Sequence, residues 1–236
     1  MTDLEKINAY VESHRDEMLE TYRKVILQES YHSAPEEVRT MGKMFKEMFE
    51  EVGFRCKLTN VGTDESGDML TGILGEDRPG KPIIFGGHMD TVHKLGSFPC
   101  KFEVDDEGKV HGPGVLDMKG GIVIALYVCK ALNEIGYNSR PLKICFAPDE
   151  EKLHKHGNTA DQFLEVCKGG EFMLNMETGL PGGDLCVSRK GKTEVALYVE
   201  GVSAHAGNDF ARGRNAIAEL CKKVTDIQAL TNLDAG

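Results

Sequence analysis

The chain has 236 residues, of which 40% are hydrophobic and 28% charged, and its formal net charge is −10. This is a globular composition. The acidic excess and the lack of a Lys/Arg cluster exclude a phosphate-backbone partner. The first 20 residues are too charged for a secretory signal peptide, and no apolar run reaches the roughly 18–20 residues that span a bilayer. The seven cysteines form no C-x-x-C pair. We therefore expect a reduced, cytoplasmic protein without a nucleic-acid or membrane partner.

The N-terminal part of the chain predicts two helices followed by two short strands. Apolar residues with helical spacing predict a helix over 3–28. A second helix is expected from Pro35 to about Val52, with Ser33 as its N-cap. Short strands are expected over 54–61 and 69–74.

The middle of the chain predicts an α/β sheet. The apolar run 82–86 does not alternate with polar residues, which is typical of a strand buried on both faces of a parallel sheet. A second buried strand is expected over 142–147. The other predicted elements are a hairpin of 102–104 and 109–111, helices over 120–135 and 158–167, and a strand over 172–176. Alternating strands and helices predict a mostly parallel sheet flanked by helices.

The pattern changes near Leu185, which predicts a second, smaller domain. Residues 186–188 and 193–200 are expected to form strands, and a helix is expected over 214–230. The alternating polarity of the second strand is typical of a sheet with one solvent face. The predicted domains are therefore 1–185 and 186–236.

Polar residues follow the first buried strand and begin the helix after it. His88 and Asp90 are two residues apart, so their side chains can point the same way. Asp90 could then supply the carboxylate that a metal-bound imidazole needs on its other nitrogen; alternatively, the pair caps a strand and a loop. Asp117 precedes Lys119-Gly120-Gly121 and a helix, where it could cap the helix or bridge two metal ions.

Further carboxylates follow the next two strands. Glu150 and Glu151 come after the strand 142–147, at the strand end where open α/β sheets bind their ligands. One could bind a metal and the other could take a proton from a metal-bound water, or both could lie in a solvated acidic loop. Glu177 offers one more carboxylate, or simply a surface charge. Together with His88, Asp90 and Asp117, these residues predict a single metal site.

The motifs GGHMDTV, GPGVLDMKGG, PDEE, NMETG and SAHAG, in this order, resemble the M20 family of two-metal peptidases and deacylases. This family includes glutamate carboxypeptidase, acetylornithine deacetylase, succinyl-diaminopimelate desuccinylase and peptidase T. The resemblance implies a zinc hydrolase with two ions per site, for which cobalt or manganese could substitute. Its substrate would be a small peptide or an N-acyl amino acid. Residues 186–236 would begin an α+β lid domain through which a homodimer could form.

The resemblance also assigns the metal ligands. His88 and Glu177 would bind one zinc ion, and Glu151 would bind the second. Asp117 would bridge the two ions. Asp90 would orient the imidazole of His88.

The resemblance further assigns two residues to catalysis. Glu150 would be the general acid and base of amide hydrolysis, and His205 would polarise the scissile carbonyl in a neighbouring subunit's site. The family's pattern continues past Gly236, so we expect this chain to be the front part of such an enzyme, without the histidine that completes the second metal's ligands. A non-catalytic metal-binding fragment is therefore the alternative to an active hydrolase.

Overall fold

A five-stranded sheet forms the centre of the first of two compact units, Met1–Asp184 and Leu185–Gly236. The computed structural model describes residues 1–98, 101–179 and 182–235. The strands are β1 (Arg55–Asn60), β2 (Asp68–Leu74), β3 (Ile83–His88), β6 (Leu142–Ala147) and β7 (Phe172–Asn175), in the spatial order β1-β2-β6-β3-β7. β3 is parallel to β6 and β7, whereas β2 is antiparallel to both β6 and β1. All strands except β2 therefore run in one direction, which confirms the predicted mostly parallel sheet.

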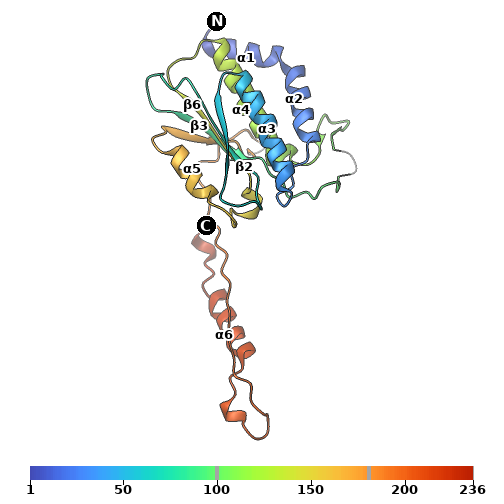
Figure 1. Ribbon diagram of the computed structural model, residues 1–236, viewed down its shortest axis with the longest axis vertical. Coiled ribbons are helices and arrows are strands. Elements are labelled where there is room, and N and C mark those ends of the chain that lie inside the picture. Colours follow the sequence, from blue (N-terminus) through green and yellow to red (C-terminus); the bar gives the residue numbers. More distant parts are fainter. Residues whose placement is uncertain (99–100, 180–181, 236) are drawn as a thin grey trace. The chain divides into compact units, whose positions relative to one another are not determined.

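Helices cover both faces of this sheet (Figure 1). They are α1 (Asp3–Ser13), α2 (Arg15–Leu27), α3 (Pro35–Glu51), α4 (Gly120–Glu134) and α5 (Thr159–Cys167). One core joins side chains of α2, α3 and α4 to the sheet, and α1 packs against α4. A smaller core lies under α5 on the opposite face.

Successive residues of the central strands enter opposite cores. Phe85 and Ile144 belong to the core beneath α3 and α4, whereas Ile84 and Cys145 belong to the core beneath α5. Burial on both faces is the reason that these strands are apolar without alternation. The predicted hairpin also forms, from β4 (Glu103–Val104) and β5 (Val110–His111).

Two predicted helix boundaries were wrong. The helix expected over 3–28 divides at His14, whose backbone is non-helical and whose ring Nδ1 lies 2.8 Å from the carbonyl oxygen of Tyr10. Helical periodicity cannot reveal this break, because the apolar spacing continues through it. The N-cap of α3 is Ala34 rather than Ser33, whose hydroxyl lies 2.9 Å from Nδ1 of its neighbour His32.

The second unit contains the helix α6 (Ala216–Gln228), two short helical turns, η3 (Phe210–Arg212) and η4 (Leu233–Ala235), and one isolated bridge. The strands expected over 186–188 and 193–200 do not form in residues 182–235, which corrects the prediction. Val187, Val195 and Tyr198 are 91%, 73% and 93% exposed. Alternating polarity stabilises a strand only where one face is buried, and neither face is buried here.

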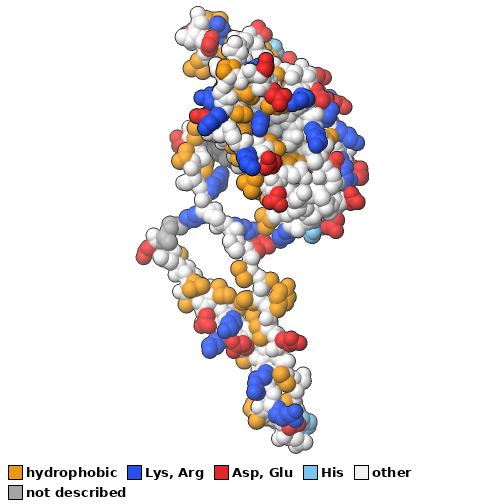
Figure 2. Space-filling view, turned by 60° about the vertical axis from the view of Figure 1, so that its left-hand side comes forward, with side chains coloured by type: hydrophobic (Ala, Val, Ile, Leu, Met, Phe, Trp, Pro, Cys, Tyr) orange, Lys and Arg blue, Asp and Glu red, His pale blue; other side chains and the backbone are white. Residues whose placement is uncertain are grey.

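The surface of the first unit carries mixed charge. Figure 2 shows Lys and Arg side chains interspersed with Asp and Glu on the face in view. Among the helices that the structure describes, none combines the length and apolarity needed to cross a membrane.

Candidate metal centre

Several chain segments deliver polar side chains to one edge of the sheet. His88 ends β3 and is paired in parallel register with Ala147, which ends β6. Glu150 and Glu151 follow β6, and Glu177 follows β7. Because parallel strands end at the same edge of a sheet, these residues arrive together at the place where such sheets bind ligands.

Asp117 comes from a helical turn, η1 (Val115–Lys119), that leads into α4. The start of α4 lies against the chain beyond β7, since a Cβ atom on Gly121 would be 1.8 Å from the carbonyl oxygen of Met176. Only glycine permits this approach. It brings the turn that carries Asp117 close to the segment that carries Glu177.

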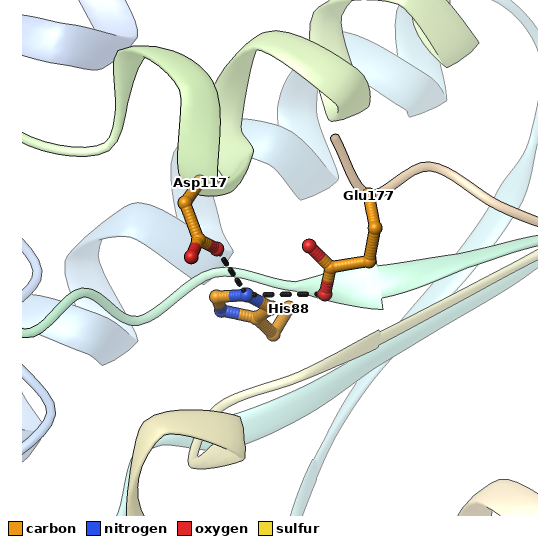
Figure 3. Close-up of side chains that lie close together, drawn as sticks. All are labelled: His88, Asp117 and Glu177. Atoms are coloured by element: carbon orange, nitrogen blue, oxygen red, sulfur yellow. Dashed lines mark hydrogen bonds and ion pairs between the residues drawn. The ribbon is translucent and has the colours of Figure 1, made fainter. Parts of the chain in front are cut away.

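The imidazole of His88 is the meeting point of these side chains, and it is buried. Figure 3 shows the carboxylates of Asp117 and Glu177 pointing at the same ring nitrogen. Nε2 lies 2.9 Å from Oδ1 of Asp117, 3.3 Å from Oε1 of Glu177 and 4.0 Å from Oε2 of Glu150. On the other side of the ring, Nδ1 lies 3.0 Å from the carbonyl oxygen of Asp90 and 3.3 Å from its Oδ1. Asp90 thus contacts Nδ1 of His88, while the other carboxylates lie around Nε2.

The surroundings of His88 strongly stabilise positive charge. Burial opposes protonation of the ring, but hydrogen bonds with Asp90 and Glu177 outweigh this effect and raise the pKa of His88 to about 11. A position where carboxylates attract a proton this strongly also attracts a metal cation. The electrostatic environment therefore suits a metal ion at Nε2.

Asp90 connects His88 to the loop that carries Glu150 and Glu151. Its buried carboxylate accepts hydrogen bonds from the backbone N–H groups of Glu150 and Glu151, both at 3.1 Å, while Oδ1 also faces Nδ1 of His88. The carboxylate therefore caps the loop after β6 and orients the imidazole at the same time. The structure therefore shows the loop-capping contacts of Asp90, and its carboxylate also lies close to the imidazole of His88.

The glutamate pair is partly buried rather than fully solvated. Burial raises the pKa of Glu151 to about 7, and the negative charge of Asp117 adds to this effect. Burial also raises the pKa of Glu150, against the influence of His88. A carboxylate that exchanges its proton closer to neutrality is suited to general acid–base work.

The residues at this edge fit a metal centre. Two groups have ligand atoms that all lie within 4.8 Å of one another: His88, Asp117 and Glu177 form the first, and His88, Glu150 and Glu151 the second. Three nitrogen and oxygen ligands with an open position are typical of catalytic zinc. The capping alternative for Asp117 does not hold, because α4 begins after Lys119 without a side-chain cap.

His205, predicted to act in catalysis, lies in the second unit. It is exposed, and its Nδ1 accepts hydrogen bonds from the backbone of Gly207 and Asn208, both at 3.1 Å. These contacts order the SAHAG loop around the ring.

Two buried charged residues near the cluster were not predicted. Asp149 is fully buried, with Oδ1 2.8 Å from Nδ1 of His154 and Oδ2 accepting from the hydroxyl of Ser66 at 3.3 Å. Lys119 is also fully buried; its Nζ donates to the carbonyl of Gln28 at 2.6 Å, and burial lowers its pKa to about 7. Asp149 lies in the PDEE motif and Lys119 in the DMKGG motif. Their places beside predicted site residues were the only feature of the sequence that could have identified them.

Comparison with known proteins shows which family the sequence matches. The profile of the peptidase family M20/M25/M40 matches residues 84–229. Carboxypeptidase G2 from Pseudomonas sp. (strain RS-16) is 27% identical over 205 residues, covering 86% of this chain and 48% of that protein. Succinyl-diaminopimelate desuccinylase from Rickettsia felis is 27% identical over 206 residues, covering 80% and 52%. The chain thus spans about half the length of these relatives.

Solved structures share the fold. The di-peptidase Dug1p from Saccharomyces cerevisiae has a TM-score of 0.64 at 20% identity, covering 74% of this chain and 41% of that one. Human carnosine dipeptidase 1 also has a TM-score of 0.64, at 19% identity, with the same coverage.

Proposed function

Because the chain belongs to the peptidase family M20/M25/M40, we propose that the protein hydrolyses an amide bond in a small peptide or an N-acyl amino acid with the help of two zinc ions. The observation that carries this proposal is the convergence of Asp117 and Glu177 on Nε2 of His88, with Glu150 4.0 Å from the same atom. Relatives named as a carboxypeptidase and as a desuccinylase support both substrate classes.

The proposed ligand roles are those that the family resemblance implies, and the proximity of the ligand atoms supports them. His88 and Glu177 would hold one ion, Glu151 would hold the second, and Asp117 would bridge them. When bound, the ions would lower the pKa of a water molecule towards neutrality and polarise the scissile carbonyl. Cobalt or manganese would also suit these oxygen-rich ligands.

Glu150 would carry the proton. Its raised pKa and its place beside His88 suit a base that accepts a proton from the attacking water. The same carboxyl group would then protonate the departing nitrogen as the C–N bond breaks, giving an acid and an amine. Asp90 would hold the imidazole of His88 and the backbone of Glu150 in one hydrogen-bonded unit.

We propose separately that residues 186–236 belong to a lid that makes a homodimer, with His205 acting in the partner's site. The SAHAG motif and the extent of the family match, to residue 229, support this role. Sedimentation equilibrium tests it: a molar mass twice that of the 26.0 kDa chain is expected, and a strictly monomeric protein would contradict it.

The catalytic role of Glu150 is tested by Glu150→Gln. The purified protein, dialysed against trace zinc, is assayed with dipeptides and with N-acetyl and N-succinyl amino acids. We expect kcat to fall by about 10²–10⁴-fold, the usual contribution of general acid–base catalysis, while zinc content stays the same. Glu165→Gln, on an exposed position of α5, is the matched control. Unchanged kcat in Glu150→Gln would exclude the proton role.

The alternative function is metal binding without catalysis. It is favoured if the wild-type protein binds zinc tightly but hydrolyses none of these substrates. Failure to bind zinc would contradict both functions.

A further inference from the structure

The carboxylate of Asp117 has one hydrogen bond of its own, to a ring nitrogen of His88. It is 60% exposed, and among the described residues it hydrogen-bonds only the ring of His88. Its backbone is also outside the regular helix, since φ and ψ are −120° and 101° at Asp117 and −133° and 31° at Met118. The position of this carboxylate must therefore be set by whatever holds the turn Val115–Lys119.

One end of the turn is held by Lys119. Its side chain is fully buried, and its Nζ donates to the carbonyl oxygen of Gln28, the C-cap of α2, at 2.6 Å. A helix C-terminus attracts a cation, but a buried ammonium is costly to desolvate. The negative charge of Glu29 acts on Lys119, but Glu29 already forms an ion pair with Lys101 at 2.9 Å. An apolar side chain would fill this space at a lower desolvation cost, so packing alone does not account for a lysine.

The other end of the turn is held by Tyr22, from the same helix. Its half-buried hydroxyl donates to the carbonyl oxygen of Val115 at 2.6 Å. Val115 and Lys119 lie two residues before and two residues after Asp117. Contacts with α2 and its C-cap therefore hold the turn on both sides of Asp117.

We propose that Lys119 and Tyr22 are positioning residues, which hold the turn Val115–Lys119 against α2 and thereby set where the Asp117 carboxylate lies relative to His88. The inference rests on the proposed function in that Asp117 is taken to be a metal ligand. Neither residue belongs to the two groups of candidate metal ligands around His88. Outer residues that orient a ligand typically contribute 10–100-fold to metal affinity.

The test compares Lys119→Met with Lys130→Met. Methionine has a similar volume to lysine and keeps the buried packing without the donor. Lys130 is a matched control because it lies on α4 but pairs with Glu17 at 2.7 Å, away from the turn. Zinc affinity is measured by competition with a chelator, and site geometry by the visible absorption spectrum of the cobalt-substituted protein.

We expect Lys119→Met to keep or raise the metal-free melting temperature, to bind zinc about 10–100-fold more weakly, and to change the cobalt spectrum. Lys130→Met should bind zinc like the wild type and leave the spectrum unchanged. A purely structural role of Lys119 would lower the melting temperature without altering the spectrum of the folded, cobalt-loaded protein, and that result would overturn the proposal.

Tyr22→Phe keeps the ring and removes only the hydroxyl. It therefore tests whether α2 positions the turn Val115–Lys119 even if Lys119→Met does not fold. A weaker zinc affinity with an altered cobalt spectrum in Tyr22→Phe supports the proposal. Wild-type values of both exclude a positioning role for Tyr22. Wild-type protein that binds no zinc would contradict the proposed function instead. Zinc binding by the wild-type protein therefore distinguishes failure of the proposed function from failure of the positioning proposal.

Discussion

Buried carboxylates at this site satisfy several donors at once. A carboxylate can accept about four hydrogen bonds, and a buried carboxylate is stable only when its oxygens are satisfied. Asp90 faces the ring of His88 and two backbone amides, and Asp149 faces His154 and Ser66. Each of these side chains therefore fixes a neighbour from another part of the chain.

Replacing Asp90 with asparagine is expected to weaken the metal site. The amide has one acceptor oxygen, so it cannot serve the imidazole and both backbone N–H groups together. We expect zinc affinity to fall by about 10–100-fold, measured by chelator competition. Asp161→Asn, on an exposed position of α5, is the control. An unchanged affinity in Asp90→Asn would show that the imidazole needs no carboxylate behind it.

The pair of His154 and Asp149 should make stability depend on pH. The hydrogen bond with Asp149 raises the pKa of His154 above 6.5 despite partial burial. A raised folded-state pKa contributes stability that is fully present below the unfolded pKa and is lost as the pH rises through the folded value. His154→Gln should therefore lower the free energy of unfolding, relative to the wild type, by more at about pH 5.5 than at about pH 8.5. Urea denaturation measures this difference. In an Asp149→Asn background this pH dependence should vanish; its persistence would assign it to another group.

At the scale of elements, β6 carries much of the core. Phe146 is fully buried, with its ring 5.7 Å from that of Phe49 on α3. Phe146→Ala should cost about 3–5 kcal/mol because it removes apolar contacts and leaves a cavity. Leu164→Ala, at a position 70% exposed, should change stability by about 0.5 kcal/mol or less. Urea unfolding followed by circular dichroism checks both, and equal effects would mean that β6 is not part of the core.

The central strands were predicted correctly from the sequence because their pattern reflects burial. The segments 82–86 and 142–147 are largely apolar because they face two cores, and both form strands. Residues 193–200 show a strand-like alternation, but they bury neither face and form no strand. Sequence patterns record which residues could be buried, whereas the partner that buries them must exist elsewhere in the fold.

The candidate site was predictable in part for a similar reason. His88, Asp117 and Glu177 were identified from their places at strand ends and at a helix start, and the structure brings them together. Lys119 was not identified, because its burial depends on where α2 lies, and a lysine is usually exposed. Asp149 was missed because its partner His154 comes close only through the turn after β6.

At the scale of the molecule, metal binding should be coupled to folding of the first unit. His88, Asp117 and Glu177 are far apart in the sequence and meet only in the folded state, so zinc should bind that state alone. Zinc at 100 times its Kd would then stabilise the unit by about 2.7 kcal/mol, which raises Tm by about 5–10 °C for a unit of this size. Calorimetry with and without zinc measures the shift, and Asp117→Ala should abolish it. A shift that survives in Asp117→Ala would place the zinc elsewhere.

The strands around the site differ in how firmly they are held. All four residues of β7 are exposed, whereas β3 and β6 are largely buried, and within the described chain β7 pairs only with β3. Short, exposed elements open more often than buried ones. Glu177 follows β7, so brief detachment of this strand would withdraw one proposed ligand while His88 stays in place. The residence time of a bound ion would then be governed by the opening rate of β7, and exchange of zinc for cobalt would follow the hydrogen-exchange rate of its amides.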